Sequence, residues 1–215
     1  MIRYTFRNQY SAAALYDGGW RASDREELIG AYELTPEEAD AIVADLREIE
    51  EEERDEQAER RIYLAYGSNL NMDQMYNRCP NAEFLGTGFL QDWKLVFRRG
   101  YLTVEPEKGC ELPFALWSVN KEDEKALDRY EGYPKFYYTL DTEVRYTDML
   151  GRENKTQAFF YRMHTKFPYE IPSWRYWETC AKGYEDCVLD EAFLEEALKE
   201  TRRLIREEKK HAADE

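Results

Sequence analysis

Residues 62–70 read Ile62-Tyr63-Leu64-Ala65-Tyr66-Gly67-Ser68-Asn69-Leu70. The run from Ile62 to Tyr66 is apolar and aromatic, as in a buried strand. Gly67 permits close approach of a ligand to the main chain, and consecutive backbone N–H groups favour an anion. Asn71 then offers an N-cap for a short helix that ends before Pro80. The stretch predicts a strand, an anion-binding loop and a helix in succession.

The stretch Tyr66-Gly67-Ser68-Asn69 is open to two interpretations, an anion-binding loop and a plain turn. The sequence contains neither Gly-x-x-x-x-Gly-Lys-Ser/Thr nor Gly-x-Gly-x-x-Gly, so a phosphate loop lacks its usual partners. A carboxylate, or an oxyanion that forms during acyl transfer, is then the anion that fits. Read from these residues alone, Tyr-Gly-Ser-Asn is equally a plain turn, because Asn and Gly are common turn formers.

The second informative stretch is Tyr130-Glu131-Gly132-Tyr133-Pro134. It follows a predicted helix that Asn120 caps and that runs from Lys121 to about Tyr130. Gly132 can adopt the left-handed conformation that ends helices. Glu131 therefore stands at a helix exit among aromatic residues. If these residues cover Glu131, its pKa rises toward the range useful for proton transfer.

Composition and charge exclude several partners. Of the 215 residues, 43% are hydrophobic, which is enough for one core and a small appendage. The seventeen tyrosines and five tryptophans favour a β-rich body. The net charge of −15 argues against nucleic acid, which requires basic patches, and against adsorption to anionic lipid. We interpret the acidity as a source of solubility.

The chain also lacks the signals of a membrane, secreted or metal-binding protein. No apolar run approaches the ~20 residues that span a bilayer, and residues 1–7 lack a signal-peptide core. We expect a cytoplasmic protein with no metal and no cofactor. A catalytic cysteine paired with His164 is an alternative without motif support, and we interpret His164 as a surface residue at a strand end. The reduced thiols expected in this compartment are Cys79, Cys110, Cys180 and Cys187.

Residues 1–60 form a small acidic, mostly helical extension in this interpretation. Thr35-Pro36-Glu37-Glu38 gives an N-cap, a first-position proline and a capping-box glutamate. Ser23 with Glu26 suggests an earlier helix start, and 10–16 fits a helix or a strand. Residues 50–61 are almost wholly charged, as in a solvated helical extension or a linker; an arm that binds a protein partner is the functional alternative. We place the domain boundary near residue 60.

From residue 61 the pattern changes to short strands, turns and interspersed helices. This order favours an α+β domain over a doubly wound sheet. We place the domain at 61–206, followed by a polar tail at 207–215 that frays. Helices are predicted after Asn120, Ser173 and Asp190, the second of them ending at Gly183. The predicted strands are 62–66, 84–87, 93–97, 101–104, 113–119, 137–146 and 156–163.

Together the two stretches resemble the γ-glutamylcyclotransferase family, in which a YGSNL-type loop holds a γ-glutamyl group and one glutamate moves protons. Residues 66–70 match that loop, and 127–132 resemble the segment that carries the glutamate. Tyr161 matches a strand tyrosine that lines the pocket. Further similarity lies at 88–95 and 172–184. The resemblance to the family as a whole spans residues 61 to about 205, so residues 1–60 lie outside it.

This resemblance implies a barrel-like mixed sheet with flanking helices and a reaction that releases 5-oxoproline. The substrate's own α-amine attacks its γ-carbonyl, so the enzyme needs no nucleophilic side chain. Glu131 would be the general acid and base. The Ser-Asn-Leu ending resembles the branch that releases amino acids more than the one that releases amines. The substrate-binding residues implied are Tyr66, Gly67, Ser68, Asn69, Leu70 and Tyr161.

Two hypotheses from other classes accompany the enzyme. One is a non-catalytic binding or regulatory module on the same fold, against which Glu131 counts, because a binding pocket has no need of a proton carrier. The other is a hydrolase or acyltransferase with a cysteine nucleophile. A small γ-glutamyl compound is the expected partner, and the leaving group and the oligomeric state stay open.

Overall fold

The computed structural model describes residues 11–214, and the side chains of 56–58 and 212–214 are outside the description. The chain divides into two compact units, with the division between Glu59 and Arg60. Each unit has a hydrophobic core of its own.

The N-terminal unit is helical and short. Its elements are α1 (Ala12–Asp17), η2 (Ala22–Asp24), α2 (Arg25–Tyr32) and α3 (Pro36–Ala58). Its core gathers the apolar residues of these helices: Leu15, Leu28, Leu34, Ala39, Ile42, Val43 and Leu46.

The capping box at the start of α3 is confirmed. The Thr35 N–H donates to Glu38 Oε2 over 2.9 Å, and the Glu38 N–H donates to Thr35 Oγ1 over 3.3 Å. The prediction for Ser23 is wrong. That residue lies inside η2, and Asp24 instead accepts from the N–H of Arg21 over 2.9 Å. Residues 12–17 are helical, and α3 continues through the charged segment to Ala58.

The second unit is a closed barrel. Its strands are β1 (Arg61–Ala65), β2 (Glu83–Arg98), β3 (Tyr101–Val119), β4 (Tyr137–Asp148) and β5 (Glu153–Met163). They follow the order β1-β3-β2-β4-β5 around the barrel. Only the β1–β5 pair is parallel among these pairings. The fold class predicted from the sequence, α+β with a barrel-like mixed sheet, is confirmed.

Strands β2 and β3 are longer than predicted. The sequence predicted the separate strands 84–87 and 93–97 in place of β2. In place of β3 it predicted 101–104 and 113–119, joined through residues 105–109. The structure continues β3 through this segment, because β2 supplies a partner along its length, including Trp93 opposite Pro106. Register shifts near Gly86 and Trp93 take up the irregularity, as bulges do.

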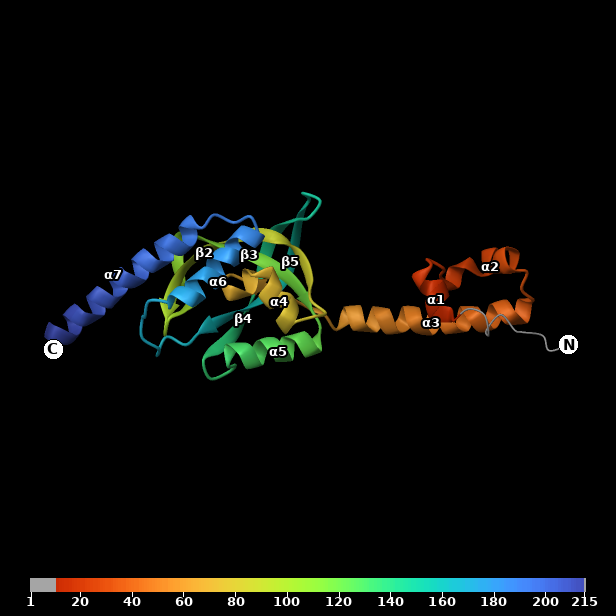
Figure 1. Ribbon diagram of the computed structural model, residues 1–215, viewed down its shortest axis with the longest axis horizontal. Coiled ribbons are helices and arrows are strands. Elements are labelled where there is room, and N and C mark those ends of the chain that lie inside the picture. Colours follow the sequence, from red (N-terminus) through yellow and green to blue (C-terminus); the bar gives the residue numbers. More distant parts are fainter. Residues whose placement is uncertain (1–10, 215) are drawn as a thin grey trace. The chain divides into compact units, whose positions relative to one another are not determined.

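In the described residues, five helical segments accompany the barrel strands, and Figure 1 labels the four α-helices among them. They are η3 (Ser68–Leu70), α4 (Met72–Arg78), α5 (Lys121–Glu131), α6 (Trp174–Asp186) and α7 (Ala192–Asp214). Asn71, Asn120 and Ser173 cap α4, α5 and α6 as predicted.

Two helix ends differ from the prediction. Helix α6 runs past Gly183 to Asp186. That glycine lets α6 lie against η3, since a Cβ there would be 2.5 Å from the Asn71 nitrogen. Helix α7 includes residues 207–214, which the sequence analysis assigned to a fraying tail. An ion pair between Arg203 and Glu207, one turn apart, supports this extension.

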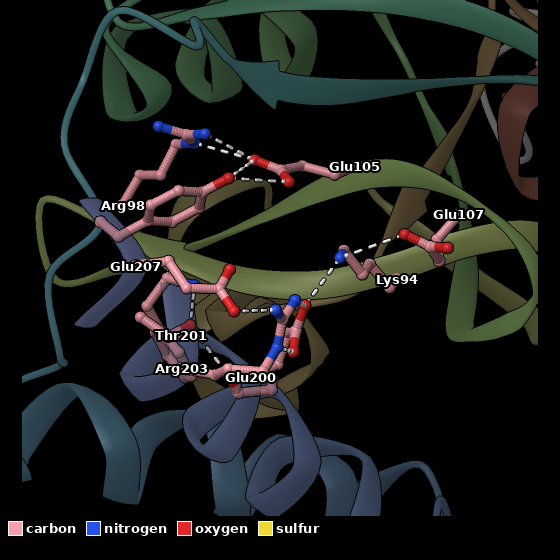
Figure 2. A network of polar contacts seen from close by, with 11 residues as sticks. Lys94, Arg98, Glu105, Glu107, Glu200, Thr201, Arg203 and Glu207 are labelled. Atoms are coloured by element: carbon pink, nitrogen blue, oxygen red, sulfur yellow. Dashed lines mark hydrogen bonds and ion pairs between the residues drawn. The ribbon is translucent and has the colours of Figure 1, made fainter. Parts of the chain in front are cut away.

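A polar network joins β2 to α7 and to the segment that precedes α6 (Figure 2). Lys94 Nζ lies 2.8 Å from Glu200 on α7 and 3.2 Å from Glu107 on β3. Nearer the end of β2, Arg98 is buried and its guanidinium lies 2.7 Å from Glu105. Both contacts fix the β2–β3 hairpin in place. No helix in the described range 11–214 is long and apolar enough to cross a bilayer.

Candidate active site

A cavity of about 490 Å³ opens between the loop after β1 and the end of α5. Its wall is largely aromatic and contains three charged side chains, Arg99, Arg129 and Glu131. The other lining residues are Tyr63, Tyr66, Gly67, Ser68, Asn69, Tyr101, Leu102, Tyr130, Gly132, Phe136, Tyr137, Tyr161, Met163 and Tyr176. The two stretches that the sequence singled out therefore share one cavity.

Glu131 is the last residue of α5 and forms part of the cavity wall. Gly132 follows it with φ 63°, the left-handed cap that the sequence predicted. The carboxylate is half-buried, and its Oε1 accepts a hydrogen bond from Asn69 Nδ2 over 3.1 Å. The helix end and the loop thus hold the carboxylate in one position.

The pKa of Glu131 is raised to about 7. Burial is the main cause, because removing water disfavours the charged form. The positive charge of Arg78 and the hydrogen bond from Asn69 act in the opposite direction and favour the carboxylate. A carboxyl group balanced in this way can both accept and donate a proton near neutral pH.

Asn69 is the centre of the polar contacts in the site. Its Nδ2 also donates to the hydroxyl of Tyr63 over 2.8 Å, and its Oδ1 accepts from Arg78. The Arg78 guanidinium lies over the Tyr130 ring at 3.3 Å from the centroid. The side-chain amide of Asn69 is thereby oriented with its N–H groups toward Glu131.

The loop after β1 lines the cavity with Gly67, Ser68 and Asn69. In the described part of the chain, the N–H groups of Gly67, Ser68 and Asn69 have no protein acceptor. Leu70 differs from these three, since its N–H donates to the Gly67 carbonyl over 2.9 Å. Its side chain is fully buried and does not line the cavity. The structure therefore places Leu70 beneath the loop.

Tyr66 and Tyr161 lie on the cavity wall and are both buried. The Tyr66 hydroxyl donates to the Tyr161 carbonyl over 2.6 Å. The Tyr161 hydroxyl donates to Asp128 on α5 over 2.7 Å. These bonds join β1, β5 and α5 around the cavity.

Three of the four cysteines lie in surroundings that disfavour nucleophilic chemistry. Cys79, Cys180 and Cys187 are buried, and burial raises the pKa of each thiol to about 12. Since the thiolate is the nucleophile, these thiols are unreactive near neutral pH. His164 directly follows β5, and its Nε2 lies 2.9 Å from the Pro134 carbonyl oxygen, outside the residues that line the cavity.

Several site residues were missed by the sequence analysis. Arg78 ends α4 and carries no motif, so only its contacts with Asn69 and Tyr130 identify it. Tyr63 lies three residues before Tyr66 in the same apolar run, which was a usable signal. Arg99, Tyr137 and Tyr176 come from three further elements or turns and meet only in the folded chain.

Comparison with known proteins gives a consistent result. Residues 63–178 match the family described as gamma-glutamyl cyclotransferase, AIG2-like. Gamma-glutamylcyclotransferase of Bos taurus is 28% identical over 147 residues, covering 63% of this chain and 76% of that protein. The protein of the same name from Mus musculus is 26% identical over 151 residues, covering 65% and 78%.

Solved structures resemble the barrel unit. A gamma-glutamyl cyclotransferase structure matches with a TM-score of 0.53 at 26% identity, covering 65% of this chain and 86% of that one. YkqA from Bacillus subtilis matches with a TM-score of 0.55, covering 74% of this chain and 60% of that one. At 17% identity, the latter is a likeness of fold.

Proposed function

Since the chain belongs to the gamma-glutamyl cyclotransferase, AIG2-like family, we propose that it releases 5-oxoproline from a small γ-glutamyl compound. The cavity around Glu131 is the proposed active site, and Glu131 is the proposed general acid and base. The observation that carries the proposal is a carboxyl group with a pKa of about 7 in a cavity that also presents main-chain donors. The reaction requires both features.

The first step is ring closure. The Glu131 carboxylate takes a proton from the substrate's α-ammonium group. The freed amine nitrogen then attacks the γ-carbonyl carbon, and a carbon–nitrogen bond forms as the carbonyl oxygen becomes an oxyanion. Holding the amine and the carbonyl within attack distance supplies much of the acceleration, because an intramolecular reaction needs only the correct folding of the substrate.

The second step is collapse of the tetrahedral intermediate. The oxyanion re-forms the carbonyl, and the bond from the γ-carbon to the leaving nitrogen breaks. Protonated Glu131 gives its proton to that nitrogen as it departs. The ring nitrogen still carries one proton more than the lactam does, and Glu131 passes this proton to the departing amine, so that 5-oxoproline and an ammonium leave and the Glu131 carboxylate is restored. The N–H groups of Gly67, Ser68 and Asn69 hold the oxyanion or the substrate α-carboxylate in this mechanism.

The walls determine how the substrate bends. Tyr66 and Tyr161 are fixed by hydrogen bonds to neighbouring elements, so they provide rigid surfaces against which the glutamyl chain folds. Rigid positioning of this kind is what ring closure requires.

The test is 5-oxoproline release from a panel of γ-glutamyl amino acids, amines and isopeptides. Glu131→Gln should lower kcat/KM by at least ~10²-fold, as loss of a general acid–base group does. Glu122→Gln, an exposed glutamate in the first turn of the same helix, is the matched control and should retain activity. Full activity of Glu131→Gln would overturn the assignment. A folded wild-type protein inactive on every substrate would favour the binding module.

A further inference from the structure

We infer that Arg99 receives a carboxylate on the leaving group, so that the enzyme selects γ-glutamyl derivatives of amino acids or peptides over those of simple amines. This inference rests on the proposed function. It assigns the discrimination between leaving groups to one side chain at the β2–β3 turn. Arg99 lines the same cavity as Glu131.

The backbone at Arg99 is unusual for its residue type. Arg98 pairs with Tyr101, so Arg99 and Gly100 are the two residues of a tight hairpin turn. Both have positive φ, 50° and 78°, as a type I′ turn requires. Asn, Asp and Gly favour the first of these positions, whereas an arginine there is strained. The turn therefore has no structural need for this side chain.

The Arg99 guanidinium is held in place without using its hydrogen bonds. It lies 5.0 Å from the centroid of the Phe136 ring and 5.3 Å from that of Phe167, within the range of cation–π attraction. The two rings stack at 5.5 Å. In the described residues, no carboxylate is within ion-pair distance of Arg99, although the chain carries a net charge of −15. Its planar donors are thus available to a carboxylate.

Neighbouring contacts fix the turn relative to Glu131. Buried Arg98 pairs with Glu105 (Figure 2) and donates to the carbonyls of Thr165 and Phe167. The Arg99 N–H donates to the Pro168 carbonyl over 3.1 Å. A Cβ on Gly132 would lie 2.5 Å from Phe136. The ring beneath Arg99 therefore packs against the residue that follows Glu131.

This arrangement separates two carboxylates of a γ-glutamyl amino acid. The loop donors of residues 67–69 take the glutamyl α-carboxylate or the oxyanion in the proposed mechanism. The leaving amino acid carries a second carboxylate, next to the nitrogen that Glu131 protonates. Arg99 offers that group a charged hydrogen-bond partner at the cavity wall, and the exposed rings of Tyr101 and Phe136 adjoin it.

The experiment uses two substrates that differ only by this carboxylate, γ-glutamylphenylalanine and γ-glutamylphenethylamine. Wild-type kcat/KM should favour the first by about 10- to 100-fold, the effect of one charge-assisted hydrogen bond. Arg99→Asn removes the guanidinium and keeps a residue that tolerates positive φ. In this variant the ratio should fall to near 1, while the thermal stability stays equal or rises. Arg202→Gln on α7, away from the cavity, should retain the wild-type ratio.

Three results would overturn the inference. One is a wild-type enzyme that turns over both substrates equally, which needs no variant to detect. Another is an Arg99→Asn variant whose kcat/KM falls by the same factor on both substrates. That result would mean that Arg99 binds the glutamyl part of the substrate, which the two substrates share. Absence of 5-oxoproline from both substrates would overturn the proposed function, and this inference with it.

Discussion

Asn69 and Glu131 are joined by a 3.1 Å hydrogen bond between the side chain of a loop after β1 and the last residue of α5. Through this bond the two stretches that stood out in the sequence become one site. The amide is a neutral donor, so it stabilises the carboxylate only in part against the effect of burial. The resulting balance places the pKa of Glu131 at about 7, and the predictions on pH follow from it.

The rate of 5-oxoproline release should depend on pH through Glu131. Below about pH 7 the carboxyl group is protonated and cannot take the proton of the α-ammonium. We expect kcat/KM to rise tenfold per pH unit on the acidic limb and to level off above about pH 7. A pH–rate profile from pH 5 to 8.5 measures this. A profile that is flat across the range would contradict the assignment.

Arg78 should determine the pH at which the acidic limb of the pH–rate profile lies. Its positive charge lowers the pKa of Glu131, so Arg78→Met should move the acidic limb to higher pH. Arg78→Lys keeps the charge and is the matched control, with a limb close to that of the wild type. The two pH–rate profiles give the answer. Equal limbs in wild type and Arg78→Met would show that the charge has no influence on Glu131.

Gly183→Ala should destabilise the barrel unit, although alanine normally strengthens a helix. The added Cβ would meet the backbone of Asn71 at 2.5 Å and Leu70 Cβ at 2.7 Å, and overpacking costs about 1–3 kcal/mol. Gly30→Ala in α2, where nothing lies within 4 Å, should stabilise the N-terminal unit by up to about 1 kcal/mol. Urea denaturation followed by circular dichroism compares them. A stabilised Gly183→Ala variant would contradict the contact.

The ion pair between Glu200 on α7 and Lys94 on β2 should weaken in acid, and with it the packing of α7 on the barrel. The pKa of Glu200 is lowered to about 2, chiefly by its hydrogen bond with Arg203 and further by Lys94. A lowered pKa adds stability above the unfolded value of about 4.5, and this contribution is lost as the pH falls toward 2. The free energy of unfolding of Glu200→Gln should therefore depend less on pH between 4.5 and 2 than that of the wild type. Identical slopes would exclude this role.

A fragment that begins at Arg60 should fold and retain turnover. The barrel unit has its own core, and the residues that line the cavity belong to it. We therefore expect that the residues before Arg60 take no part in the chemistry. Activity and thermal denaturation of the fragment, against the full chain, measure both points. A large loss of kcat in a folded fragment would assign the N-terminal unit a part in catalysis.

Much of the fold was predictable because the signals are local. The caps at Asn71, Asn120 and Ser173 act within one helical turn, and Gly132 ends α5 by its own conformation. The merging of short runs into β2 and β3 was not predictable in the same way. There, pairing along the whole β2–β3 hairpin, which includes Trp93 opposite Pro106, overrides the turn signal of residues 105–109.

The cavity shows the same contrast between local and long-range signals. Short patterns pointed to Glu131 and to residues 66–69, and all of these line the cavity. Only contacts across the fold bring in Arg78, Arg99 and Tyr176. No pattern in the sequence around these residues indicates that they lie at the cavity or next to it. Leu70 belongs to the same loop sequence, but its side chain packs beneath the loop and does not line the cavity.

The position of Glu131 at the carboxyl end of α5 has a cost for the folded state. Helix dipoles place partial negative charge at that end, where an acidic side chain is unfavourable and a lysine or arginine is favoured. Selection of this chain for heat resistance alone would therefore replace Glu131 early. Thermostable variants obtained without a screen for turnover would gather substitutions at the residue on which the proposed chemistry depends.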